Sequence, residues 1–397
     1  MSVRKREWTT PKGVAKSAWV VDYFDTAGKR RLKTFTKKKQ ADEFAATASV
    51  EVRAGVHVAD SASVTVAKAA DLWITSGEGA GLERSTVDQR RNHVEHHIKP
   101  LIGSTLLSKH TVPTIREFED KLRKEGRSPA MVKKVLTSLG SVFADANERG
   151  LATRNPVRDI KRNRNGRDRR AEKRQKGRLE VGVDIPTRDE IKALLAVLEG
   201  NWRPILLTVI FTGVRSSELR GLRWQDVDLK RGEIAVRQRV DQYRQVGKPK
   251  SEAGTRTIPI PPLVTNALKE LKLKQGNGIE FVFANPDGNT RSHSNVVLKG
   301  LQPAMIKAGV TIDTGERDKK GKRILAAKYT GLHALRHFYA SWLINRKEDG
   351  GIGLPAKMVQ ERLGHSSIVM TMDVYGHLFV SEDDGKELAD AASALLT

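Results

Sequence analysis

Hydrophobic and polar residues alternate near the start of the chain. In SAWVVDYF, the residues Trp19, Val21 and Tyr23 fall on one face of a predicted strand, and KRRLKTFT predicts a second strand after the turn DTAG. The stretch KKKQADEFAATASVEVRAG follows as a predicted helix that ends at Gly55. Residues 1–63 are therefore predicted to form a small β-sheet with one helix.

From residue 64 to residue 157 the apolar residues recur at helical spacing. Four stretches show this pattern: TVAKAADLWIT, STVDQRRNHVEHHIKPLIG, TVPTIREFEDKLRKEG and SPAMVKKVLTSLGSVFADANERG. We expect the second helix to stop before Pro100. The fourth has Ser128 as N-cap, Pro129 at the first helical position and Gly150 past its end. Four helices with short connections predict a compact bundle.

Residues 158–185 are predicted to be a basic linker. Between residues 158 and 178 there are 11 Lys and Arg against 3 Asp and Glu, a net charge of +8, and almost no apolar residues. Such a segment cannot build a core, and it can lie along DNA phosphates. A solvated spacer is the alternative. The candidate DNA contacts here are Arg162, Arg164, Arg169 and Arg170.

Residues 186–397 are predicted to form a larger, mostly helical domain. TRDEIKALLAVLEG is a capped helix, and WRPILLTVIFTGVRSSELRGLRW carries two more helices that join at Gly213. GEIAVRQR and TRTIPIP predict two strands around a Lys-rich turn. The predicted fold class is therefore multidomain α+β: a small sheet with a helix, a helical bundle, and a helical domain with a small antiparallel sheet.

The charge of the chain points to a polyanionic partner. Its 397 residues carry a formal net charge of +24, which suits nucleic acid, although a surface charge that only aids solubility is the alternative. Residues 1–64 contribute 13 Lys and Arg against 7 Asp and Glu, a net +6. The first module can present a basic sheet face to DNA, or that face is simply solvated. The DNA-binding candidates in it are Trp19, Tyr23, Lys29, Arg30, Arg31 and Lys33.

Two features of the composition exclude whole classes of site and location. The chain has no cysteine, so disulfides, thiolate catalysis and cysteine-based metal sites are excluded. No apolar stretch approaches the length that spans a bilayer. We therefore expect a soluble, intracellular protein without a membrane partner.

Chemically capable residues recur in four stretches of the last domain. They are Arg215 in TGVRSSELRGLRW, Lys250 in KPKSEAGTRTIPI, His333 and Arg336 in LHALRHFYASWLI, and His365 and Tyr375 in RLGHSSIVMTMDVYGHL. Each motif is weak alone, because a single His or Tyr in a helix usually serves packing. The combination in this order is far more specific: Arg, Lys, His-x-x-Arg, Gly-His and then Tyr ten residues later.

This combination resembles the tyrosine recombinase, or phage integrase, family. The resemblance covers the whole chain, with residues 64–157 similar to the core-binding domain and residues 186–397 similar to the catalytic domain. Residues 1–63 resemble the arm-binding domain of lambda-type integrases. This likeness rests on the pattern of predicted strands and helix and not on a sequence motif. The resemblance implies that the protein cuts and rejoins DNA through a 3′-phosphotyrosine intermediate, without metal or cofactor.

The resemblance also implies a role for each residue. Tyr375 would be the nucleophile, while Arg215 and Arg336 would stabilise the charge of the pentacoordinate transition state. Lys250 would protonate the leaving 5′-oxygen. His333 would handle the tyrosine proton or contact the phosphate.

The resemblance also implies roles for other residues near these motifs. His365 would donate a second hydrogen bond to the phosphate, and Glu218 would orient an arginine. Lys248 lies two residues before Lys250, on the same predicted strand face, so it is a second candidate for the general acid. His377 is expected to lie on the helix surface or in packing.

The family also implies an assembly. We expect double-stranded DNA with core and arm attachment sites as substrate, a homotetramer on DNA, and an excisionase and a DNA-bending host factor as partners. The gene would belong to a phage or an integrative element, and the protein would act on DNA in the bacterial cytoplasm. The tail SEDDGKELADAASALLT docks either on its own domain or on a neighbouring protomer. Two rival functions are a type IB topoisomerase-like nicking and closing enzyme and a non-catalytic DNA-binding regulator.

Overall fold

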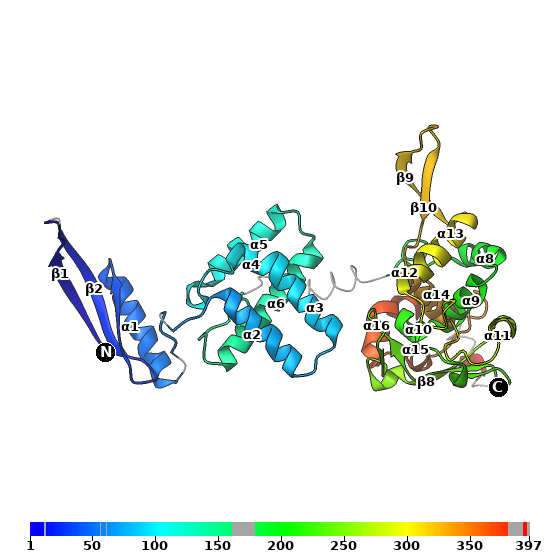
Figure 1. Cartoon of the computed structure of the whole chain (residues 1–397), viewed down its shortest axis with the longest axis horizontal. Coiled ribbons are helices and arrows are strands. Elements are labelled where there is room, and N and C mark those ends of the chain that lie inside the picture. Colours follow the sequence, from blue (N-terminus) through cyan, green and yellow to red (C-terminus); the bar gives the residue numbers. More distant parts are fainter. Residues whose placement is uncertain (12, 56, 61, 161–178, 380–391, 395–397) are drawn as a thin grey trace. The chain divides into compact units, whose positions relative to one another are not determined.

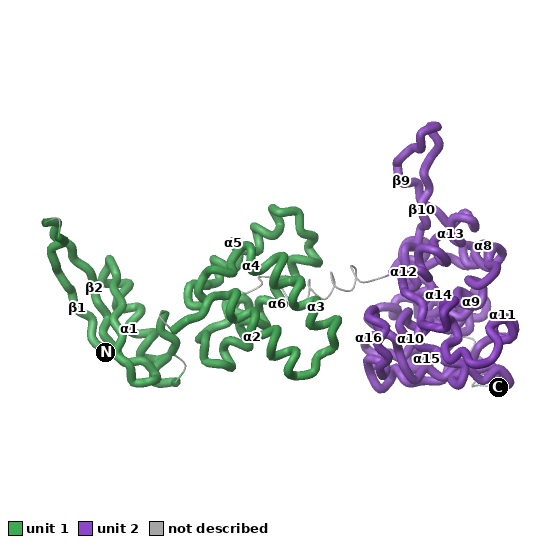
Figure 2. Tube along the Cα trace, in the orientation of Figure 1, with its two compact units in different colours: residues 1–163 green, residues 164–397 purple. Residues whose placement is uncertain are grey.

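The computed structural model describes the whole chain except residues 12, 56, 61, 161–178, 380–391 and 395–397. The chain divides into two compact units, residues 1–163 and residues 164–397 (Figure 2). Three separate clusters of buried apolar side chains hold them, two in the first unit and one in the second. No helix in the described part of the chain is long and apolar enough to cross a membrane.

The N-terminal module is a three-stranded antiparallel sheet with a helix packed on one face (Figure 1). Its elements are β1 (Ser2–Thr9), β2 (Ala15–Phe24), β3 (Arg30–Phe35) and α1 (Lys38–Arg53). Val21 and Tyr23 of β2 meet Ala41 of α1 in its core, as the alternating pattern of β2 requires. The two predicted strands and the helix are present, and β1 is a third strand that the sequence analysis did not predict.

Five α-helices lie in the rest of the first unit, as far as the structure describes it. They are α2 (Val66–Gly79), α3 (Arg84–His93), α4 (Lys99–Ile102), α5 (Val112–Lys124) and α6 (Pro129–Glu148), with a π-helical turn at Val94–Ile98 and a short 3₁₀ turn at Leu107–Lys109. Ser128 caps α6 by accepting the main-chain N–H of Met131 at 3.3 Å, and Gly150 follows its end at φ 68°. Both ends of α6 were predicted correctly.

The predicted end of the second helix at Pro100 is wrong. The helical path continues through Pro100 to Ile102. A π-helical turn precedes the proline, in which Lys99 donates its main-chain N–H to the carbonyl of Val94, five residues back. This wider turn leaves Pro100 in the first turn of α4, where its missing N–H breaks no α-helical hydrogen bond.

The second unit packs helices around a small antiparallel sheet. Its helices are α8 (Arg188–Val197), α9 (Trp202–Thr212), α10 (Ser216–Arg220), α11 (Pro262–Gln275), α12 (His293–Asn295), α13 (Gln302–Lys307), α14 (Leu332–Ile344), α15 (Ala356–Leu363) and α16 (Ile368–Tyr375). The described residues of this unit also include a π-helical turn at Val296–Leu301 and 3₁₀ turns at Trp224–Asp226, Glu252–Gly254 and Gly376–Phe379. The sheet order is β4 (Val227–Asp228), β5 (Glu233–Val236), β8 (Arg256–Pro259), and β6 (Arg239–Val240) pairs with β7 (Val246–Gly247).

A further hairpin in this unit was not predicted. β9 (Thr311–Arg317) and β10 (Arg323–Ala327) pair in antiparallel fashion and stand away from the body of the unit (Figure 1). Most of the hairpin is exposed on both faces, so its sequence lacks the apolar alternation that marks a half-buried strand. The sequence analysis assigned no element to this stretch of a domain that it expected to be mostly helical.

Candidate active site

Four segments of the second unit converge on one cluster of side chains. Arg215 lies at the start of α10, Arg336 in the second turn of α14, His365 in the turn between α15 and α16, and Tyr375 at the end of α16. Helix α14 packs against α9 and α15, and α15 packs against α16. Residues that lie up to 160 positions apart in the sequence therefore come together in one place.

A buried carboxylate orients Arg215. Glu218 accepts the main-chain N–H of Arg215 at 3.0 Å and its Nη1–H at 2.8 Å, and Arg215 also donates Nη2–H to the carbonyl of Gly364 at 2.9 Å. Arg256 of β8 donates to the same carboxylate at 2.8 Å. The two guanidinium groups hold the pKa of the Glu218 carboxyl below its usual range, against the opposing effect of burial.

Arg256 also connects neighbouring segments of the site. Its Nε–H donates to the carbonyl of Arg362 at 2.8 Å, and its Nη1–H donates to the carbonyl of Gly254 at 2.8 Å. It therefore links the loop after Lys250, the carboxylate beside Arg215 and the end of α15. The sequence analysis did not identify Arg256.

Arg336 is fixed by main-chain oxygens. Its side chain is buried and donates Nη1–H to the carbonyl of Gly213 and Nη2–H to the carbonyl of Leu363, each at 2.6 Å. Three further N–H groups remain on the guanidinium for a phosphate. Burial and the nearby Arg215 and Arg256 lower the pKa of Arg336 to about 9, so it stays charged at neutral pH.

Two glycines in left-handed conformation shape this arrangement. Gly213 ends α9 at φ 58°, and Gly364 ends α15 at φ 65°. A Cβ atom at position 213 would lie 2.5 Å from the ring of Tyr339, and one at position 364 would lie 2.7 Å from the guanidinium of Arg256. Both positions therefore require glycine, for backbone conformation and for space.

Tyr375 is buried and hydrogen-bonded to a histidine that the sequence analysis missed. Its hydroxyl lies 2.7 Å from Nδ1 of His337, on α14. His337 directly follows Arg336 and lies four residues after His333, on the same helix face. That spacing was a usable signal. Burial raises the pKa of the Tyr375 hydroxyl to about 12, although Arg336 and Arg215 oppose this shift.

His365 stacks on the nucleophile candidate. The rings of His365 and Tyr375 are nearly parallel, at 5°, with centroids 6.3 Å apart. Nδ1 of His365 lies 2.9 Å from the hydroxyl of Thr371. Burial, followed by the charges of Arg336 and Arg215, lowers the pKa of His365 to about 3, so the ring is neutral at neutral pH.

His333 lies at the edge of this cluster. Its exposed ring meets the ring of His337 edge-on, with centroids 4.8 Å apart. The partner of the Tyr375 hydroxyl is His337, not His333. His377 hydrogen-bonds through Nε2 to the carbonyl of Leu179 at 2.9 Å, in agreement with its expected packing role.

Lys250 and Lys248 lie in the loop that follows β7, and both are exposed. Neither belongs to a strand, so the expected alternation between strand faces does not apply to them. Pro249 separates the two lysines, and a Cβ atom on Gly254 would lie 2.5 Å from its ring. The geometry therefore leaves the choice between these two lysines open.

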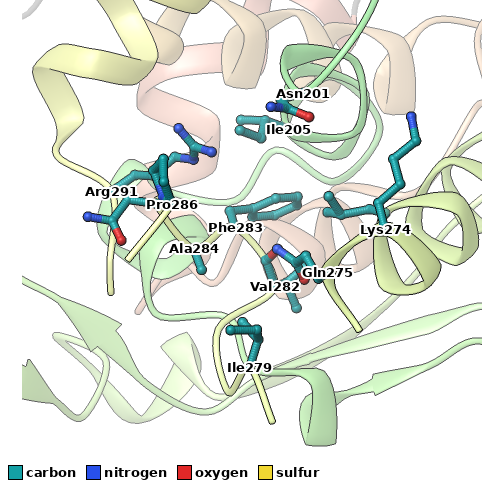
Figure 3. Close-up of a pocket in the computed structure, with 12 residues that line it drawn as sticks. Asn201, Ile205, Lys274, Gln275, Ile279, Val282, Phe283, Ala284, Pro286 and Arg291 are labelled. Atoms are coloured by element: carbon teal, nitrogen blue, oxygen red, sulfur yellow. The ribbon is translucent and has the colours of Figure 1, made fainter. Parts of the chain in front are cut away.

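The cluster is separate from the cavity shown in Figure 3. That cavity, of ≈ 350 Å³, lies among α9, α11 and the loop before α12, and its lining includes Asn201, Phe283 and Arg291 but none of the residues proposed for catalysis. The described residues contain no group of three or more His, Asp or Glu side chains that could hold a metal ion.

Tyr23 is unsuitable as a DNA contact. Its side chain is buried under α1, and its hydroxyl lies 2.9 Å from Nε2 of His57. Trp19 shares this face and is partly buried, with Lys38 over its ring. The expectation that these aromatic residues read DNA is corrected for Tyr23, because alternation along β2 turns them toward the helix.

The basic candidates of this module divide between the two faces of the sheet. Register pairs Arg31 with Tyr23 and Lys33 with Val21, so both lie on the helix side, where they form ion pairs with Asp25 and Asp60 at 2.8 Å. Arg30 lies on the open face and is exposed, although it pairs with Asp22, and Lys29 is exposed in the turn before β3. The open face also carries Arg4, Arg6, Trp8, Phe24 and Leu32.

Arg162, Arg164, Arg169 and Arg170 of the linker lie outside the described residues, as does most of the C-terminal tail.

Comparison with known proteins gives a consistent family. The phage integrase family model matches residues 186–382, and the model of the phage integrase central domain matches residues 66–163. A tyrosine recombinase XerC-like protein of Caldanaerobacter subterraneus is 28% identical over 355 residues, which are 82% of each chain. The ICEBs1 integrase of Bacillus subtilis is 26% identical over 318 residues, 76% of each chain.

Solved structures support the same fold. The Tn1549 transposon integrase, in complex with a circular intermediate DNA, superposes with a TM-score of 0.61 over 84% of this chain and 100% of that one, at 19% identity. A lambda integrase dimer bound to a core site gives a TM-score of 0.56 over 95% of each chain, at 18% identity. The α+β fold class is therefore confirmed, and the chain belongs to the phage integrase family, the tyrosine recombinases.

Proposed function

We propose that this protein is a site-specific DNA recombinase, an integrase of a phage or integrative element, that cuts and rejoins DNA through Tyr375. The observation that carries the proposal is the setting of the Tyr375 hydroxyl. The hydroxyl lies 2.7 Å from Nδ1 of His337, and the ring of His365 is parallel to the Tyr375 ring. Two oriented arginines, Arg215 and Arg336, belong to the same unit. The named relatives are tyrosine recombinases and integrases, which agrees with this chemistry.

In the proposed reaction Tyr375 attacks the scissile phosphorus. The attack forms a 3′-phosphotyrosine ester and releases a 5′-hydroxyl, so the bond energy is kept for rejoining. Negative charge grows on the non-bridging oxygens in the transition state. The N–H groups of Arg336 that main-chain oxygens leave unused, together with Arg215, are suited to bind those oxygens.

The remaining roles follow from donor chemistry. Lys250 protonates the leaving 5′-oxygen, with Lys248 as the alternative donor. His365 donates Nε2–H to the phosphate when its Nδ1 accepts the hydroxyl of Thr371. His333 contacts the phosphate from the exposed edge of the cluster. No step in this scheme needs a metal.

We propose the following division of labour along the chain. Residues 1–63 bind arm-type DNA through the open face of the sheet, residues 64–157 bind the core site, residues 158–185 follow the DNA backbone, and residues 186–397 carry out catalysis. Another family member, lambda integrase, has been solved as a tetramer bound to a Holliday junction. A homotetramer on two DNA partners, in the bacterial cytoplasm, with an excisionase and a DNA-bending factor, completes the proposal.

The central test is Tyr375→Phe with a DNA duplex nicked near the crossover point, which traps a covalent complex. We expect the variant to bind the site within a few-fold of wild type and to form no adduct, because the ring is kept and only the nucleophile is lost. Gel shift and denaturing electrophoresis measure the two properties. Adduct formation by Tyr375→Phe would refute the assignment of the nucleophile.

The same assay separates the rival functions. A wild-type protein that binds DNA but never traps it would be a non-catalytic regulator. One that traps and relaxes supercoiled DNA but never exchanges strands between two sites would be a topoisomerase-like enzyme.

A further inference from the structure

The Tyr375 hydroxyl has one described hydrogen-bond partner, Nδ1 of His337 at 2.7 Å. The two residues come from different helices, α14 and α16, and their ring centroids lie 5.8 Å apart. A nucleophilic phenol must lose its proton as it attacks phosphorus. A neutral imidazole nitrogen at hydrogen-bond distance is the usual acceptor for such a proton.

The other two histidines of the cluster are less well placed. The ring of His365 is parallel to that of Tyr375, but its Nδ1 is paired with Thr371, and the hydrogen bond of the Tyr375 hydroxyl goes to His337. His333 meets the edge of the His337 ring and not the hydroxyl. The phenol proton therefore has one acceptor in direct reach among the described histidines.

The surroundings of His337 keep its ring neutral. Burial, then the neighbouring His333 and Arg336, lower the pKa of His337 to about 4, while Asp184 acts in the opposite direction. Tyr375 faces it from α16 with its proton retained, because the pKa of that hydroxyl is about 12. At neutral pH the pair is therefore a protonated phenol next to a free base.

We infer that His337 is a further catalytic residue, the proton acceptor for Tyr375 in cleavage and its proton donor in rejoining. The inference rests on the proposed function. In cleavage the Tyr375 oxygen bonds to phosphorus, its proton moves to Nδ1 of His337, and the P–O5′ bond breaks as Lys250 protonates the 5′-oxygen. In rejoining the 5′-oxygen attacks, its proton returns to Lys250, the P–O bond to Tyr375 breaks, and His337 returns the proton. The negative phosphate offsets the transient charge on the imidazolium.

The test is single-turnover cleavage of a nicked suicide duplex between pH 6 and pH 9. Protonation of His337 should have little effect on the wild-type cleavage rate, because the ring stays unprotonated over the whole pH range. His337→Phe should slow cleavage about 10²- to 10⁴-fold at pH 7. Its rate should then rise about tenfold per pH unit, because the reaction needs the phenolate and the pKa of Tyr375 is about 12.

Three variants serve as comparisons. Glutamine is smaller than phenylalanine and is polar, so His337→Gln is a second test if His337→Phe does not fold. It should show the same pH dependence as His337→Phe. His333→Gln should lower the rate without creating the tenfold rise per pH unit. His377→Gln, two residues past the nucleophile but bonded to Leu179, should cleave within threefold of wild type. Thermal unfolding and DNA affinity are measured for each.

The outcomes separate this inference from the proposed function. If folded His337 variants cleave within threefold of wild type with an unchanged pH profile, His337 is not the proton acceptor. If the new pH dependence arises in His333→Gln instead, the role belongs to His333. The proposed function fails only if the wild-type protein forms no adduct at Tyr375, as shown by mass spectrometry of the trapped peptide.

Discussion

Main-chain oxygens hold the arginines of the site. Arg336 donates to the carbonyls of Gly213 and Leu363, and Arg215 to the carbonyl of Gly364. Carbonyl groups at helix ends have no intrahelical partner, so they are free to accept these donors. A main-chain acceptor also moves less than a long side chain. The guanidinium groups are therefore aimed before DNA arrives, which is what preorganised charge stabilisation requires.

The lowered pKa of His365 predicts acid sensitivity. The folded protein holds this ring neutral down to about pH 3, whereas the unfolded chain takes up a proton near pH 6.5, so the unfolded state binds more protons between these values. The free energy of unfolding should fall by about 2 kcal/mol from pH 7 to pH 5 through His365 alone. Urea unfolding at both pH values should show this loss in wild type and a smaller one in His365→Gln. An equal loss in both proteins would place the acid sensitivity elsewhere.

The general acid can be identified with a sulfur-substituted substrate. A 5′-phosphorothiolate leaves as a thiolate and needs no proton, so it bypasses the residue that protonates the 5′-oxygen. Lys250→Ala should cut the normal substrate at least 10²-fold more slowly and the phosphorothiolate near the wild-type rate. Arg336→Ala should stay slow on both, because it acts on the transition-state charge. Rescue of Lys248→Ala in place of Lys250→Ala would move the role by two positions.

The sequence pointed to some residues of the site and missed or misjudged others. Arg215, Arg336, His365 and Tyr375 lie in recognisable motifs, and the structure brings all four together. His337 was missed because a second histidine in a helix looks like packing until the α14 and α16 faces are known to meet. Tyr23 was misjudged because alternation assigns a residue to a face but does not say which face the helix covers.

Elements with an apolar face were easier to predict than elements without one. Helix α6 has both an apolar stripe and capping residues, and the structure confirms its ends. The β9–β10 hairpin buries little, so no periodicity revealed it. The path through Pro100 depends on a π-helical turn, which has no sequence signature of its own.

The tip of the β9–β10 hairpin is a candidate DNA contact. Lys319, Lys320 and Lys322 are exposed there, while Asp318 accepts the main-chain N–H groups of Lys320 and Lys322 and so fixes the turn. Changing the three lysines to Gln should lower the slope of log affinity against log salt by up to about 2.7, at about 0.9 for each phosphate that the variant no longer neutralises. Binding at several salt concentrations measures this slope.

The control has the same change of net charge elsewhere on the unit. Gln at Lys269, Lys272 and Lys274 of α11 removes three charges from a helix that contributes none of the proposed catalytic residues. An equal change of slope in both triple variants would mean that the hairpin has no special contact with DNA.

The modules of the chain have separate cores. The cluster around Val21, Tyr23 and Ala41 shares no buried residue with the bundle cluster, which begins at Val66. Polar contacts connect the two modules: Asp60 pairs with Lys109 at 3.2 Å, and Ser63 accepts the main-chain N–H of Ser108. Such exposed ion pairs contribute little to stability.

Deletion of residues 1–63 should therefore leave a folded protein. Helix α2 keeps its own cap, because Thr65 accepts the main-chain N–H of Lys68. We expect the truncated chain to cut a short core site in the trapping assay and to lose protection of a second, separate DNA sequence. Footprinting of both proteins on attachment-site DNA checks this. Identical footprints would show that the first module does not read arm-type DNA.

The position of Tyr375 along the chain has a consequence for protein synthesis. The nucleophile is translated after both arginines, the lysines and the three histidines of the site. The last helix of the site, α16, ends with Tyr375 itself. In the proposed reaction, a chain that ends before this codon lacks the nucleophile and cannot break a DNA strand. Strand cleavage by this route therefore becomes possible only when the last helix of the site has been made.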